Sequence, residues 1–97
     1  MTISYARVRT EHASRYLVQL SKHWSHKFPE LAYDQTHADI PLPGAPCFLD
    51  AATGHLDIRI TTGTEADAGR FEQVVADHLK RFAFKEDLTF EWTRSEA

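Results

Sequence analysis

Two stretches of the chain place apolar side chains at the spacing of an amphipathic helix. The first should begin at Thr10, whose hydroxyl can cap a helix N-terminus, and end near Phe28, because Pro29 disfavours helical backbone before it. The second should begin after Thr64 as its N-cap residue, and its apolar face extends to Phe82. The apolar stripes of the two helices are Ala13, Tyr16, Leu17, Leu20 and Trp24, and Ala68, Phe71, Val74, Val75 and Leu79.

The other segments alternate between apolar and polar residues, which is typical of strands with one covered face. The pattern is clearest in HLDIRIT (55–61), where Leu56, Ile58 and Ile60 fall on one side. The expected strands are 3–8, 37–42, 47–51, 55–61 and 88–92, with a weaker strand at 30–34. The order β-α-β-β-β-(β)-α-β predicts an α+β fold, a two-layer sandwich with two helices packed on one face of a mainly antiparallel sheet.

Length and composition narrow the class of protein. With 97 residues, the chain has room for a single α+β domain spanning residues 1–97. Its formal net charge of -3 argues against broad nucleic-acid binding, which needs a basic surface. Cys47 is the single cysteine, so no internal disulfide can form, and this suits a reducing compartment. We see no signal peptide and no apolar run that could span a membrane, so we expect a cytoplasmic protein without a membrane partner.

His78 falls within the apolar stripe of the second predicted helix, beside Val74 and Phe82. A buried imidazole is costly unless it is hydrogen-bonded. The favoured interpretation is a core histidine whose partner is a backbone carbonyl or a tyrosine such as Tyr5 or Tyr16, because most buried polar groups have partners within the protein. A role in binding a metal or another ligand is the alternative.

His23 and His26 are three residues apart, so they can face the same side of the first helix. Such a pair could hold iron or zinc, and His78 could join it if the two helices are neighbours and their rings converge. Stable metal sites usually need three or four ligands, so a solvated helix border is the favoured interpretation of the pair. His37 and His55 begin predicted strands and are interpreted as ordinary turn residues.

The sequence contains no legible catalytic motif. Cys47 alternates with Leu49 and Ala51, which predicts a buried and unreactive thiol. The four glycines match no phosphate-binding loop, and G-x-S-x-G, H-E-x-x-H and C-x-x-C do not occur. These observations favour a protein that is not an enzyme.

Two long stretches and one short stretch carry a resemblance to a known family. ASRYLVQLSKHWSHKF (13–28) and VVADHLKRFAFKEDLTFEW (74–92), together with ARVRT (6–10), resemble DUF2218, a family of small bacterial proteins of unknown function. The resemblance implies no established activity. It adds an iron-linked species to the ligands that we expect. It rests on Arg15, Tyr16, Leu17, Gln19, Leu20, His23, His26, Lys27, His78, Leu79, Arg81, Phe82, Phe84, Glu86 and Leu88.

Core packing does not explain why basic residues such as Arg15 and Lys27 belong to this pattern. Basic and histidine side chains beside aromatic rings can bind a carboxylate or phosphate. We therefore predict a binding or accessory module for a small anionic or iron-linked ligand. A homodimer without a ligand, joined through sheet or helix surfaces, is the alternative, and an enzyme is the third. The predicted site residues are His23, His26, Lys27, His78 and Arg81.

Overall fold

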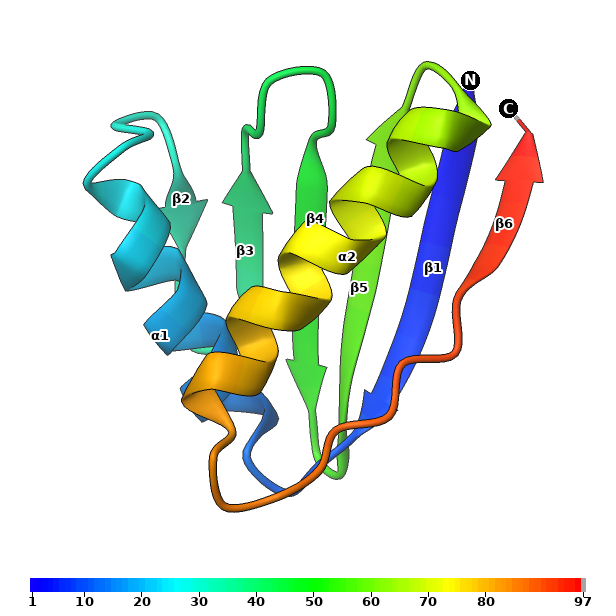
Figure 1. Cartoon of the computed structure of the whole chain (residues 1–97). Coiled ribbons are helices and arrows are strands. Elements are labelled where there is room, and N and C mark those ends of the chain that lie inside the picture. The colour runs from blue at the N-terminus through cyan, green and yellow to red at the C-terminus, as the bar shows by residue number, and fades with distance from the viewer. Residues whose placement is uncertain (97) are drawn as a thin grey trace.

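The computed structural model describes residues 1–96, which form two helices and six strands. Along the chain these elements are β1 (Thr2–Arg9), α1 (Ala13–Ser25), β2 (Ala32–Tyr33), β3 (His37–Ile40), β4 (Cys47–Ala52), β5 (His55–Thr62), α2 (Glu65–Phe82) and β6 (Thr93–Glu96). The strands form one antiparallel sheet in the order β2-β3-β4-β5-β1-β6 (Figure 1). The weak strand expected at 30–34 corresponds to β2.

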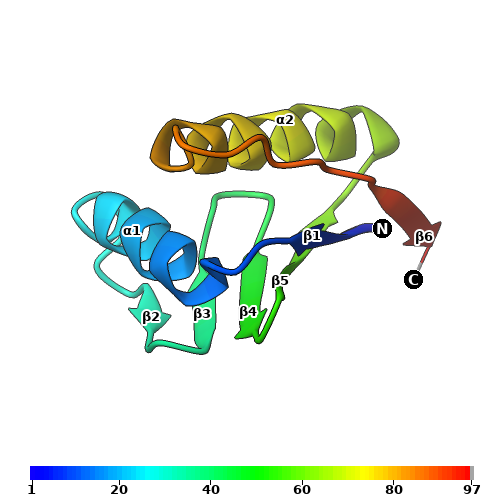
Figure 2. The same cartoon turned by 90° about the horizontal axis from the view of Figure 1, so that it is seen from below.

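Both helices lie on the same face of the sheet and leave the other face uncovered (Figure 2). α1 packs mainly against β3 and β4, whereas α2 crosses β5 and β1 diagonally (Figure 1). The helices also contact each other, and the second half of α1 lies beside the second half of α2. The predicted two-layer α+β sandwich is therefore confirmed.

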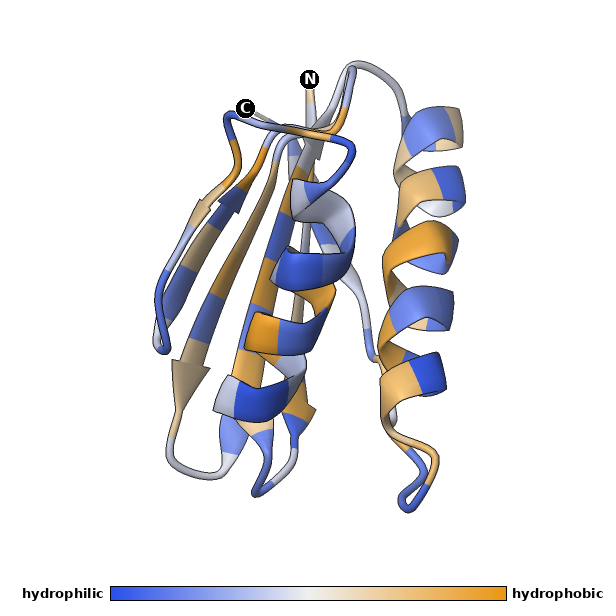
Figure 3. Ribbon diagram, turned by 90° about the vertical axis from the view of Figure 1, so that its left-hand side faces the viewer, coloured by the Kyte–Doolittle hydropathy of each residue, from blue (hydrophilic) through white to orange (hydrophobic). Residues whose placement is uncertain are grey.

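The strand register determines which side chains reach the helices. β1 and β5 pair with Ala6 opposite Ile58 and Val8 opposite Leu56. Alternate residues of both strands are buried, because successive side chains of a strand point to opposite faces of the sheet. Figure 3 shows the same alternation of apolar and polar residues along the strands. The largest fully buried side chains of the core between the layers are Leu17, Leu20, Ile40, Leu49, Leu56, Ile58, Ile60 and Leu79.

The ends of α1 differ from the prediction. The helix begins at Ala13 with His12 in the N-cap position, and no side chain caps it. Thr10 lies two residues further out, where its hydroxyl accepts the His12 backbone N–H at 3.0 Å. The last helical residue is Ser25, so the helix stops before Phe28. The Thr10 hydroxyl also donates to the carboxylate of Glu86, a contact that the local sequence does not reveal.

The second helix begins as predicted. The Thr64 hydroxyl caps the helix by accepting the Asp67 backbone N–H at 3.1 Å. The helix ends at Phe82, with Lys80 and Arg81 in its last turn, where cations interact favourably with the helix dipole. Among residues 1–96, no helix has the length and apolarity needed to cross a membrane.

The last strand lies later in the chain than predicted. β6 (Thr93–Glu96) pairs with β1, whereas the expected strand, residues 88–92, runs as irregular chain toward it (Figure 1). Leu88 is buried, and the Phe90 and Trp92 rings stack at 6.2 Å and pack against the core. An alternating pattern reports burial on one side, and burial does not require a paired strand. The prediction of a strand at 88–92 was wrong for this reason.

Candidate functional site: a groove between the helices

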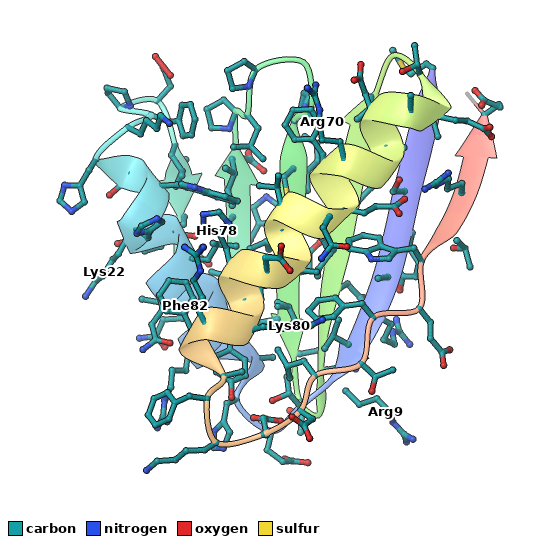
Figure 4. All side chains as sticks on the ribbon, viewed as in Figure 1. Arg9, Lys22, Arg70, His78, Lys80 and Phe82 are labelled. Atoms are coloured by element: carbon teal, nitrogen blue, oxygen red, sulfur yellow. The ribbon has the colours of Figure 1, made fainter. Side chains whose placement is uncertain are left out.

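His78 is half-buried at the border of the core, in the space between α2 and α1 (Figure 4). Its Nδ1 donates a hydrogen bond of 2.7 Å to the carbonyl oxygen of Val74, one turn earlier in the same helix. The predicted backbone-carbonyl partner is confirmed, although the ring is not fully enclosed. Because a carbonyl can only accept, Nδ1 carries the proton and the neutral ring presents Nε2 as an acceptor.

Two aromatic rings of α1 lie against His78. The centre of its ring lies 4.9 Å from that of Trp24 and 5.5 Å from that of His23. The His23 ring also meets the edge of the Phe82 ring, with centres 6.2 Å apart. The structure thus brings His23 and His78 together from different helices, which is the condition under which both could contact the same ligand.

A groove of about 320 Å³ lies beside these rings, and we call it the helix groove. Lys27 contributes a positive charge and His78 a polar ring edge, while the other side chains are apolar. Pro43 and its neighbour Leu42 come from the loop between β3 and β4, so three separate parts of the chain build the groove. Its lining consists of Trp24, Lys27, Phe28, Leu42, Pro43, Phe71, Val74 and His78.

Three of the five predicted site residues, His23, His26 and Arg81, do not line the helix groove. His26 is the exposed C-cap residue of α1, and Arg81 is exposed in the last turn of α2. No three His, Cys, Asp or Glu side chains within residues 1–96 are arranged to hold a metal ion. A metal at His23 would therefore need ligands that come from bound cargo or from solvent.

A second pocket of about 320 Å³ lies where the start of α1 meets the end of α2, and we call it the Tyr16–Glu86 pocket. The buried Tyr16 hydroxyl and the Thr10 hydroxyl both donate to Oε2 of Glu86, the latter at 3.1 Å. Burial and the hydrogen bond to Glu86 raise the pKa of Tyr16, so its hydroxyl stays protonated at neutral pH. The pocket is lined by Glu11, His12, Arg15, Tyr16, Gln19, Phe82, Phe84, Lys85 and Glu86.

Sequence reasoning placed Tyr16 in the core and did not predict this second pocket. The signal was nevertheless present, because many of the residues that carry the family resemblance line it. The pattern includes charged residues that core packing leaves unexplained. These residues become neighbours only when the fold brings the start of α1 next to the end of α2. The residues shared by the resemblance and the pocket are Arg15, Tyr16, Gln19, Phe82, Phe84 and Glu86.

His37, interpreted from sequence as a turn residue, bridges two carboxylates on the uncovered sheet face. Its Nδ1 lies 2.8 Å from Asp50 on β4, and its Nε2 lies 2.6 Å from Asp39 on β3. The hydrogen bond to Asp50 is the main cause that raises the pKa of His37, and the contact with Asp39 adds to it. Cross-strand pairing of His37 with Asp50 creates this cluster, and strand register is not legible in the sequence.

Cys47 is fully buried, and burial raises the pKa of its thiol to about 12. A thiol with such a pKa carries almost no thiolate at neutral pH, and the thiolate is the reactive form. The predicted unreactive cysteine is confirmed.

Fold and site together define a small two-layer α+β domain whose helices enclose a groove above an antiparallel sheet. The chain belongs to the family described as "Uncharacterized protein conserved in bacteria (DUF2218)", whose profile matches residues 5–93. It is similar to the protein in the NMR structure of PA4090 from Pseudomonas aeruginosa, with 36% sequence identity and a TM-score of 0.79 over 96% of each chain. No protein with a curated functional description matches the chain. The predicted family is therefore confirmed.

Proposed function

We propose that this protein is a non-enzymatic binding module of the bacterial cytoplasm that takes a small anion with an apolar body into the helix groove. The observation that carries the proposal is the position of Lys27 and His78 on a groove that is otherwise apolar and aromatic. Ligand pockets commonly combine an apolar lining with a few polar groups that fix the ligand's orientation.

The two polar side chains suit a carboxylate or a similar anion. Lys27 carries three N–H donors on a flexible stem and is exposed, so it can reach a ligand at the mouth of the groove. A protonated His78 would add an Nε2–H donor, because its Nδ1 is already bonded to Val74. Arg81, which is exposed in the last turn of α2, would contribute positive charge without direct contact, and His26 lies exposed at the end of α1.

The apolar part of the ligand would pack against aromatic side chains. Trp24 and Phe28 supply this surface from the α1 side, and Phe71 supplies it from α2. A volume of about 320 Å³ fits one aromatic ring with a short substituent. A hydroxylated aromatic acid could also chelate iron through its own oxygens, so an iron-linked ligand remains within this proposal.

Binding of 2-hydroxybenzoate, a single ring that bears a carboxylate and can chelate ferric iron, tests the proposal. Replacing Lys27 by Gln removes one charge-assisted hydrogen bond, which should weaken binding by about 1–2 kcal/mol, or roughly 5- to 30-fold. Lys22→Gln is the matched control, because Lys22 is an exposed cation in the last turn of α1 that does not line the groove (Figure 4). Equal affinities of the two variants, measured by isothermal calorimetry, would contradict the proposal.

Three further arms separate the alternatives. Ferric 2-hydroxybenzoate binding more tightly than the free acid would identify an iron-linked ligand. Zinc or ferrous iron that raises the melting temperature of the wild type, but not of a variant with His23→Ala and His26→Ala, would indicate a metal held by those residues. Native mass spectrometry that shows a dimer without any retained small molecule would favour the homodimer.

A further inference from the structure

Glu86 is a half-buried carboxylate whose charge no cation neutralises within residues 1–96. It takes part in no ion pair there, and its two hydrogen bonds come from the uncharged hydroxyls of Thr10 and Tyr16. Both donors reach Oε2, so Oε1 is the oxygen left to accept from a ligand. A carboxylate fixed by two neighbours and facing a pocket is a preorganised partner for a cationic donor.

The same pocket also contains positive charge. Arg15 and Lys85 both line it, and neither forms an ion pair with a described residue. Arg15 presents a planar guanidinium that can bind a carboxylate through two parallel hydrogen bonds. Gln19, one turn further along α1, adds an amide that can donate or accept. The pocket therefore offers partners of both signs.

Aromatic side chains form the apolar side of the pocket. Phe84 is 81% exposed, the largest exposed fraction among the large apolar side chains of residues 1–96, and it lines the pocket together with Phe82. The Lys85 ammonium lies 5.7 Å from the centre of the Phe84 ring, so an apolar surface and a cation are adjacent. A ligand that packs against Phe84 would remove this ring from water.

We propose that the Tyr16–Glu86 pocket binds a small zwitterion, namely an α-amino acid with an apolar or aromatic side chain. Its ammonium group donates to Glu86, its carboxylate binds Arg15 and Lys85, and its side chain packs against Phe84. A simple anion is repelled by Glu11 and Glu86, and a simple cation by Arg15 and Lys85, so a molecule with both charges is the complementary partner. The volume of about 320 Å³ suits one amino acid.

Three probes of nearly the same shape test the charge requirement. L-Phenylalanine carries both charges, 2-phenylethylamine lacks the carboxylate, and 3-phenylpropionate lacks the ammonium. Dissociation constants come from titrations of 15N-labelled protein followed by NMR, which also locate the site. L-Phenylalanine should bind at least about tenfold more tightly than either analogue, with the largest shifts at the pocket. Equal binding of all three probes, shifts confined to the helix groove, or no saturable binding of L-phenylalanine would overturn the proposal.

Two variants test the residues. Glu86→Gln keeps an oxygen that can accept from Tyr16 but removes the charge, so L-phenylalanine and 3-phenylpropionate should then bind equally well. Arg15→Gln is a surface change that leaves the Glu86 cluster intact and should remove most of the preference for L-phenylalanine over 2-phenylethylamine. Arg81→Gln, the loss of an exposed cation outside the pocket, is the control and should leave all three affinities within about twofold. Unchanged preferences in both Glu86→Gln and Arg15→Gln would overturn the proposal.

Discussion

Glu72 and Arg94 form an ion pair beneath α2 that holds the last strand to the rest of the protein. The Glu72 side chain is buried, with 7% of the residue exposed, and it receives N–H bonds from Arg94 at 2.8 and 3.0 Å. The Ser4 hydroxyl on β1 donates a third bond at 2.6 Å. β6 is a four-residue edge strand that pairs with β1, and this cluster links it to α2.

Replacing Arg94 by Met keeps the aliphatic stem and removes the guanidinium. Loss of one partner from a fully buried ion pair costs about 3–5 kcal/mol, because a charge is left uncompensated. The Arg94 side chain is 38% exposed, so water can partly replace it, and we expect a smaller loss of about 1.5–3 kcal/mol. In a domain of this size, each kcal/mol corresponds to a fall in melting temperature of about 4–8 °C.

The pH dependence gives the prediction a second, independent readout. Burial alone would raise the pKa of Glu72, but the hydrogen bonds from Arg94 and Ser4 and the nearby positive charge outweigh it and lower the pKa below the ordinary 4.5. A lowered folded-state pKa contributes stability that is present above the unfolded-state pKa and is lost as pH falls through the folded-state value. The stability difference between the wild type and Arg94→Met should therefore shrink below about pH 4.5.

Urea denaturation followed by circular dichroism measures both effects. Arg70→Met is the matched control, because Arg70 pairs with Asp67 on the exposed side of α2 and should cost less than about 0.5 kcal/mol. A double-mutant cycle with Glu72→Gln isolates the pair, and we expect a coupling energy of about 1–2 kcal/mol. An Arg94→Met variant that is no less stable than Arg70→Met, or whose deficit is independent of pH, would refute this reasoning.

Two further predictions concern the core and the uncovered sheet face. Leu20→Ala should lower the free energy of unfolding by about 2–5 kcal/mol, because Leu20 is fully buried. Phe71→Ala should lower it less, because Phe71 lies at the half-exposed wall of the helix groove. Equal and small losses for both variants in urea denaturation would show that the helix faces are misassigned. His37→Gln should destabilise the protein below about pH 6.5 and have little effect once pH exceeds the raised pKa of His37, because a raised folded-state pKa stabilises only while the ring is protonated. The effect should stay below about 1 kcal/mol because the His37 side chain is 47% exposed, and a pH-independent difference between the two proteins would contradict the assignment.

The architecture was predictable because it depends on periodic patterns that are local in sequence. The stripe through Tyr16, Leu20 and Trp24 has one buried side in any compact fold, and so does the alternation in β5. The hydroxyl of Thr64 can be interpreted in the same way, since its capping partner lies only three residues further on. Each of these features involves partners within one or two turns.

Features that depend on distant partners were not predictable. The carboxylate that receives the Thr10 hydroxyl belongs to Glu86, 76 residues along the chain, so the local sequence does not reveal this hydrogen bond. Tyr16 looks like an ordinary core aromatic until its hydroxyl is seen to donate to the same carboxylate. Periodicity reports whether a side chain is buried, and it carries no information about which polar group lies opposite.

The predicted histidine site could be read from the sequence only in part, because periodicity gives positions along a helix and not the contacts between helices. The helical positions of His23 and His78 could be read from the pattern, and the structure places their rings 5.5 Å apart. Periodicity could not predict how the two helices cross, and this crossing determines that Lys27 lines the groove and that His23, His26 and Arg81 do not. The order of elements limits such geometry without determining it.

Phe82 connects the two proposed sites. Its ring meets His23, whose ring contacts His78 on the helix groove, and Phe82 also lines the Tyr16–Glu86 pocket. A truncation at Phe82 would therefore disturb both sites, and a loss of binding in such a variant could not be assigned to either. Charge changes at Lys27 and Glu86 act on one site each, because neither side chain lines the other pocket. If both proposals hold, Lys27→Gln should leave the affinity for L-phenylalanine unchanged and Glu86→Gln should leave the affinity for 2-hydroxybenzoate unchanged, because no described residue lines both pockets.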